Sequence, residues 1–246
     1  MRPLFQIYTF GRFEIKSCQG DKTVKPLTTK SLALLKLLAA SANCCLSTRT
    51  IKELLYIDYS PNKASQALDT QIHRLRKQLG NDQAITRQGE SVSLDLEYFW
   101  IDICIFEAVC ARLITPDNAY AIAKQLQGVY LGEYLPNEDS LDVVANRERY
   151  RNMYLATLFK CVENLHEQAE SAIALCQYAL VLEPLSEPLY RKLIAIYLLH
   201  GNRDMAEATM AQCRNVLKRY LDCDLSQETL SLLDTPPTPM RISFLK

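Results

Sequence analysis

The feature of this sequence that most constrains its fold is a weak internal repeat with a period of 34 residues in the second half of the chain. The repeated positions run from His166, Ala172, Ala174, Ala179 and Leu182 to His200, Ala206, Ala208, Cys213 and Val216. Small side chains that recur at such a period indicate places where neighbouring helices approach each other closely. Pro184 and Gly201 lie where these helices would have to break. The repeat therefore predicts stacked pairs of helices.

Helical segments fill the chain beyond Trp100-Ile101-Asp102, where the alternation typical of β-strands ends. We expect helices at about 103–114, 117–130, 140–166, 169–182, 186–199 and 203–220. Paired helices at a period of 34 residues are the signature of tetratricopeptide repeats. Residues 101–235 are therefore predicted to form an all-α, tetratricopeptide-like domain, and the proline-rich residues 236–246 to form an irregular tail.

Strand patterns occur only in the first hundred residues. The stretch 5–15 alternates and is rich in aromatic and β-branched residues, which predicts two or three short strands that turn at Gly11 and near residue 20. Three helices are expected next, at about 28–42, 48–56 and 62–79, and the last of them ends at Gly80. A β-hairpin with a polar tip is expected at 84–96. This order predicts an α+β winged-helix domain over residues 1–100.

The charge is divided unevenly between the two predicted domains. Residues 1–100 contain 14 Lys and Arg against 9 Asp and Glu, whereas residues 101–246 contain 14 against 19. A basic half followed by an acidic half indicates that only the first half meets a polyanion, although chance alone can produce such a difference. Nine cysteines without a Cys-x-x-Cys pair are typical of reduced thiols, and no apolar run is long enough to cross a bilayer. We therefore expect a cytoplasmic protein without a membrane segment.

The third predicted helix carries the candidate site. Its apolar residues form a narrow stripe that predicts the side facing the core: Leu68, Ile72, Leu75 and Leu79. The opposite face holds Lys63, Gln66, Thr70, His73, Arg74 and Lys77, with Arg76 to one side and Gln71 to the other. Such side chains reach base edges and phosphates when a helix enters the DNA major groove. Arg87, in the predicted wing, is placed to contact the neighbouring backbone. The alternative is a solvated basic surface.

The sequence also resembles a known family. The stretches that carry the resemblance are Ile7–Ile15, Gln66–Gly80, Trp100–Glu107, Tyr130–Pro136, Arg147–Tyr150, Pro184–Leu193, Ala206–Leu221 and Asp224–Leu233. They look like the SARP-type activators, which join an OmpR-type winged helix to a bacterial transcriptional activation domain. The resemblance covers about residues 5–234. Similar modules stand at the C-terminal end of MalT-type regulators, so the chain could be part of a longer protein.

The resemblance implies a sequence-specific activator that binds direct repeats near a promoter, as a homodimer in one possible arrangement, and recruits RNA polymerase. It assigns the third helix as the recognition helix, with Thr70, His73, Arg74 and Arg76 at base-reading positions. The resemblance assigns Lys63 and Lys77 as phosphate contacts.

Two other functions are weighed against DNA binding. The first is a protein–protein adaptor whose winged helix no longer binds DNA, because the wing tip carries the acidic Glu90 and Tyr56 replaces the family's usual Trp. The second is an enzyme, which the sequence disfavours. It has neither a Walker A loop nor a Gly-x-Gly-x-x-Gly loop, no Ser-His-Asp order, and three well-separated histidines. We therefore predict no catalytic residue, cofactor or metal.

Overall fold

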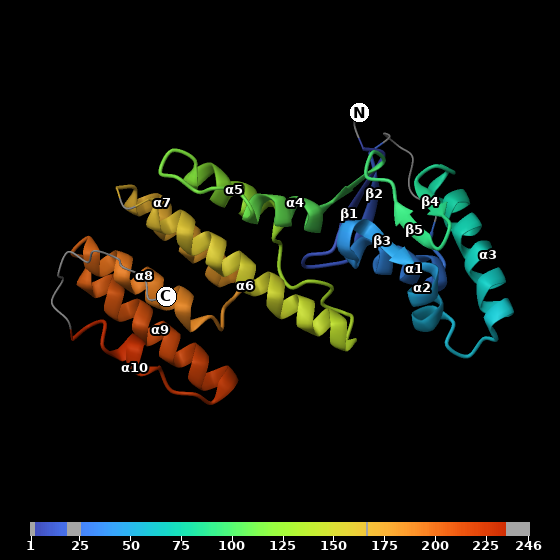
Figure 1. Cartoon of the computed structure of the whole chain (residues 1–246). Coiled ribbons are helices and arrows are strands. Elements are labelled where there is room, and N and C mark those ends of the chain that lie inside the picture. Colours follow the sequence, from blue (N-terminus) through green and yellow to red (C-terminus); the bar gives the residue numbers. More distant parts are fainter. Residues whose placement is uncertain (1–2, 19–25, 166, 235–246) are drawn as a thin grey trace. The chain divides into compact units, whose positions relative to one another are not determined.

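The computed structural model describes residues 3–18, 26–165 and 167–234. The chain divides into two compact units, Met1–Ile105 and Phe106–Lys246 (Figure 1). Every strand of the described residues belongs to the first unit, and the described part of the second unit is helical. An α+β winged helix followed by an all-α unit is the fold class that the sequence predicts, and the structure confirms it. No helix among the described residues has both the length and the hydropathy needed to cross a membrane.

A small sheet opens the first unit. Its strands are β1 (Phe5–Tyr8), β2 (Glu14–Ser17) and β6 (Phe99–Ile101), in the order β2-β1-β6. The turn between β1 and β2 contains Gly11 in the left-handed region, with φ 75°, as the predicted turn requires. β6 runs parallel to β1 and was not expected, because three residues are too few to show an alternating pattern. Its pairing partner lies more than 90 residues earlier in the chain.

Asp102 joins the end of this sheet to the following helix. Its carboxylate has no solvent exposure and accepts hydrogen bonds from the amides of Thr9 (2.6 Å), Phe10 (3.0 Å) and Ile103 (2.8 Å). The Thr9 hydroxyl donates a fourth, at 2.7 Å. Burial raises the pKa of Asp102, and these hydrogen bonds offset part of that rise. The carboxylate thus ties β1 to the start of α4 (Asp102–Cys110).

Three helices form the middle of the first unit: α1 (Thr29–Ala40), α2 (Thr48–Leu55) and α3 (Pro61–Leu79). Local signals set their ends. The side chains of Thr28 and Ser47 accept hydrogen bonds from the first-turn amides of α1 and α2, and Gly80 ends α3 in the left-handed conformation with φ 69°. The predicted apolar stripe of α3, Leu68, Ile72, Leu75 and Leu79, is buried.

The predicted hairpin forms the wing. It consists of β4 (Ile85–Gln88) and β5 (Ser91–Leu94), with Gly89 at φ 58° in the turn. A short strand, β3 (Cys45–Ser47), follows a turn of 3₁₀ helix (Ala42–Cys44) and pairs with β5, so the sheet order is β3-β5-β4. β3 has no sequence signal of its own because three residues are too few for one.

The second unit continues from α4 with α5 (Ala119–Val129), α6 (Leu141–Glu163), α7 (Ala169–Leu182), α8 (Glu187–Leu199), α9 (Arg203–Leu221) and the short α10 (Gln227–Leu230). These bounds agree closely with the expected helical segments, apart from α4, which is shorter, and α10, which was not expected. Glu183, directly after α7, accepts a hydrogen bond from the Tyr130 hydroxyl at 2.6 Å and pairs with Arg151 Nε at 2.8 Å. The Tyr130 ring stacks on Tyr154 with centroids 4.1 Å apart. One carboxylate therefore joins the ends of α5 and α7 to α6.

The 34-residue repeat corresponds to α7 and α9, which begin at equivalent positions of the two repeats. Four of the six small repeated residues lie where helices pack, since Ala172, Ala179, Ala206 and Cys213 are buried. Ala174 and Ala208 are exposed instead, so the expectation that all the small residues mark helix contacts is wrong for this pair. They share a position on the solvent side of the two helices. His166 and the predicted tail, 236–246, lie outside the described residues.

Candidate nucleic-acid interface

One face of α3 gathers most of the predicted site. Six of the nine predicted residues lie exposed on it: Lys63, Gln66, Thr70, His73, Arg74 and Lys77. The face is opposite the buried stripe, because both follow the helical period from the same helix. Thr70, His73, Arg74 and Lys77 line a shallow depression of about 370 Å³, together with Gln78. Sequence reasoning omitted Gln78, although it lies one turn after Arg74.

Gln71 does not belong to this face, which corrects its assignment as a DNA contact. Its side chain is only 3% exposed, and Nε2 donates a hydrogen bond to the Ser31 hydroxyl at 2.6 Å. The Ser31 hydroxyl in turn donates to Gln78 Oε1 at 2.5 Å, and Gln78 Nε2 donates to the carbonyl of Pro26 at 2.9 Å. This chain of polar contacts joins α3 to α1. Burial decides the role of Gln71, since a side chain covered by α1 cannot reach a base.

Arg76 also has a role that the sequence did not indicate. Its guanidinium donates two hydrogen bonds to the carbonyl oxygen of Ile85 on β4, from Nε at 2.9 Å and from Nη2 at 2.6 Å. The side chain is half-buried and occupies the flank of α3 that faces the wing. Arg76 therefore connects α3 to the wing, a role that its expected base-reading position did not indicate.

Arg87 lies on the same side of the helix. It is exposed on β4 and forms an ion pair with Asp69 of α3. The backbone of the wing tip is also held, because the Thr48 amide donates to the Glu90 carbonyl at 2.7 Å. The wing is thus attached to α3 by Arg76 and Arg87 and to the start of α2 by Glu90. Its acidic side chain, Glu90, remains exposed at the tip.

The resulting surface carries three exposed cations along α3. Lys63, Arg74 and Lys77 extend from the exposed face, while Asp69 is partly neutralised by Arg87. α3 has 19 residues, which corresponds to about 28 Å of helix at 1.5 Å per residue. The two lysines lie near its ends, and Arg74 lies between them. Within the part of the chain that the structure describes, no group of three His, Cys, Asp or Glu side chains could hold a metal ion.

Comparison with known proteins identifies both units. Residues 108–235 match the family model of the bacterial transcriptional activator domain, and residues 22–91 match that of the C-terminal domain of transcriptional regulatory proteins. The comparison with curated proteins found no match.

Among solved structures, the chain is similar to Mycobacterium tuberculosis EmbR in complex with a low-affinity phosphopeptide, with 18% sequence identity and a TM-score of 0.56. The match covers 95% of this chain but 65% of the EmbR chain, so this chain spans less than two thirds of that structure. At this identity the likeness shows a shared fold. The activator-domain model alone matches more than half of the chain. The chain therefore belongs to the bacterial transcriptional activator domain family, and its winged helix in front of that domain makes it a SARP-type regulator.

Proposed function

We propose that this regulator binds a specific sequence of double-stranded promoter DNA through α3 and activates transcription by recruiting RNA polymerase. The observation that carries the proposal is the exposed face of α3, on which Lys63, Arg74 and Lys77 lie opposite a buried apolar stripe. An α-helix of this kind fits the major groove, where arginine reads guanine and lysines contact phosphates. The protein would then act in the cytoplasm, where promoter DNA and RNA polymerase meet.

The positions of the exposed residues along α3 suggest which of them would contact phosphates and which would contact bases. Lys63 and Lys77 lie near the two ends of the helix, where it would cross the phosphate backbones, and Thr70, His73 and Arg74 lie between them. Phosphate contacts fix the register of a protein on DNA, whereas contacts with base edges specify the sequence. The hydrogen bonds from Arg76 to Ile85 hold the wing beside the helix, so Arg87 would approach the backbone next to the groove.

The second unit would supply the activating contact. Stacked helical pairs present extended surfaces suited to proteins, and the family of residues 108–235 consists of activator domains. Two copies would bind adjacent direct repeats as a homodimer. Native mass spectrometry on duplexes with one and with two sites would check this: two copies should load only on the duplex with two sites.

A protein–protein adaptor is the second candidate. It is favoured by Glu90, which puts a negative charge on the exposed wing tip, and by Asp69, which already pairs with Arg87. Both features would weaken attraction to phosphates.

Binding-site selection from a random duplex pool distinguishes the two. The selected duplex and a scrambled one would be titrated at several salt concentrations. A DNA-reading activator should prefer the selected duplex and lose affinity steeply as salt increases. Weak binding without preference would support the adaptor instead. Arg214→Ala, an exposed change in α9, is the matched control and should leave the titration unchanged.

A further inference from the structure

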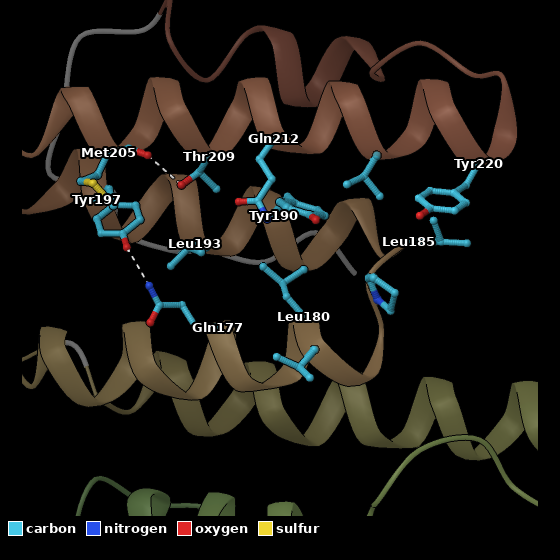
Figure 2. A pocket seen from close by; sticks show the side chains of 13 residues that line it. Gln177, Leu180, Leu185, Tyr190, Leu193, Tyr197, Met205, Thr209, Gln212 and Tyr220 are labelled. Carbon is cyan, nitrogen blue, oxygen red and sulfur yellow. Dashed lines mark hydrogen bonds between the residues drawn. The ribbon is translucent and has the colours of Figure 1, made fainter. Parts of the chain in front are cut away.

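An apolar groove on the second unit is not used by the proposed DNA contacts. It has a volume of about 780 Å³, and Figure 2 shows α8 between α7 on one side and α9 on the other. Tyr190 and Tyr197 of α8 are buried and form its floor. Val181, Met205 and Tyr220 form its walls, with 77%, 42% and 63% of their surfaces exposed. Large exposed apolar side chains that line one groove are typical of a binding surface.

The polar groups of the groove are uncharged and mostly have partners. Among the described residues that line it there is no charged side chain. Gln177 Nε2 donates to the Tyr197 hydroxyl at 3.2 Å, and Thr209 Oγ1 donates to the Met205 carbonyl at 2.7 Å. An occupant that brought a charge into this groove would lose its hydration without gaining a partner. The groove therefore suits a segment that turns several apolar side chains to one side and keeps its charges outside.

We propose that this groove binds the chain's own residues 235–246 in cis. Within residues 240–244, Met240, Ile242 and Phe244 alternate with Arg241 and Ser243, and Leu245 and Lys246 follow them. Side chains of an extended segment point alternately to opposite sides, so the three apolar residues would enter the groove while Arg241 and Ser243 face water. This proposal stands independently of DNA binding by α3.

The length of the segment fits the distance it must cover. Arg203 Nη2 donates to the Leu233 carbonyl at 3.3 Å, so the described chain ends beside the start of α9, close in sequence to Met205. Residues 235–239 contain three prolines and would span about 15 Å as polyproline II, more than the 10–12 Å width of a helix. Residues 240–244 would extend about 17 Å, so Lys246, two residues further on, would lie past the end of the groove. The groove runs from Met205 to Tyr220, about 22 Å along α9.

Binding in cis would fill the groove with residues 235–246 of the same molecule. A short connection gives an effective concentration in the millimolar range, so even a segment with low affinity would fill the groove. Any other protein that uses the groove would first have to displace residues 235–246.

Photo-cross-linking in the full chain tests where the segment lies. With Phe244 replaced by p-benzoylphenylalanine, irradiation should join it within one molecule to residues of the groove such as Val181 or Tyr220, as located by mass spectrometry. The same replacement at Ser243 is the matched control and should give several-fold less of these products. Cross-links elsewhere on the chain, or equal yields from both positions, would overturn the proposal. Cross-links between two copies that increase with protein concentration would also overturn it.

A binding experiment tests the same contact without a photoreactive group. A fluorescent peptide of residues 235–246 should bind a variant that ends at Asp234 at least ten times more tightly than it binds the full chain. Val181→Glu in the shortened variant should remove this binding, whereas Leu199→Glu, an exposed apolar residue outside the groove, should not. Circular dichroism checks that all variants fold. Equal binding to the full and the shortened chain, or no binding to either, would contradict occupancy in cis.

Discussion

The Arg76 guanidinium and the Ile85 carbonyl oxygen are joined by two hydrogen bonds, from Nε at 2.9 Å and from Nη2 at 2.6 Å. This contact connects the proposed recognition helix to the first strand of the wing. The opposite flank of α3 is connected to α1 through Gln71 and Ser31. The exposed face of α3 is therefore held on both sides by neighbouring elements. The backbone that carries its cationic side chains is fixed in place by these contacts.

Replacing Arg76 by Ala should lower the thermal stability of the protein and leave its base preference unchanged. The Ile85 carbonyl would lose both donors, and hydrogen bonds of a charged group contribute about 1.5–3 kcal/mol, so thermal unfolding should begin at a lower temperature. DNA affinity should decrease for all sequences alike, because the wing is displaced while the base-reading side chains remain. Circular dichroism melts and titrations against selected and scrambled duplexes would check both effects. A change in base preference would contradict the positioning role.

Arg74→Ala should act on recognition alone. Its side chain is exposed, so folding should be unaffected. A bidentate arginine–guanine contact contributes about 1–3 kcal/mol of discrimination, so affinity for the selected duplex should decrease about ten- to a hundredfold, with relaxed preference at one base pair. Competition against single-base variants of the selected duplex measures this. If affinity and preference both stay as in the unchanged protein, this face does not read DNA.

Lys77→Ala is expected to behave differently from Arg74→Ala. A phosphate contact carries no sequence information, so the loss of this exposed lysine should weaken binding to every duplex similarly. The slope of log affinity against log salt should fall by about one unit. The measurement is the same titration over several salt concentrations. An unchanged slope would remove Lys77 from the set of phosphate contacts.

Glu187 should make the second unit sensitive to acid. Burial raises its pKa, but hydrogen bonds from the Thr229 hydroxyl (2.5 Å), the Ser226 hydroxyl (2.7 Å) and the Ser226 amide (2.8 Å) outweigh this and lower the pKa below its ordinary value. A carboxyl whose pKa is lowered by folding stabilises the protein above its unfolded-state pKa and loses that contribution as the pH falls through the folded-state pKa. Glu187→Gln should therefore destabilise the protein at pH 7, and the difference from the unchanged chain should shrink below about pH 4. Unfolding curves at several pH values would check it; a difference independent of pH would contradict it.

The two units should fold separately when the chain is divided after Ile105. A fragment of residues 1–105 keeps Asp102 and the whole of β6, whereas a fragment of residues 1–100 lacks Asp102 and leaves the amides of Thr9 and Phe10 without their acceptor. Leaving a buried donor unpaired costs about 1–3 kcal/mol, so the longer fragment should melt at a clearly higher temperature. Equal melting temperatures, or an unfolded 1–105, would argue against this division of the chain.

Local chemistry alone determined most of the helical framework. Thr28 caps a helix because its side chain accepts from an amide three residues away, and Gly80 ends one because glycine tolerates a positive φ. The buried stripe of α3 and the exposed face opposite it follow from a period of 3.6 residues. These signals act over a few residues, so the sequence contains them completely. For the same reason the bounds of α7 and α9 could be predicted from a repeat.

Only the tertiary structure decided the short strands and the partners of side chains at the edges of these helices. β6 depends on β1, which is distant in the chain, and its three residues carry no pattern of their own. Gln71 and Arg76 both flank the same helix and look equally polar in the sequence, yet α1 buries the first and the wing engages the second. Ala174 repeats as faithfully as Ala172 but faces solvent. A side chain at the edge of a helical face can point to water, to a neighbour or to DNA, and packing against distant elements selects among these because burial of a polar group is favourable only where a partner is present.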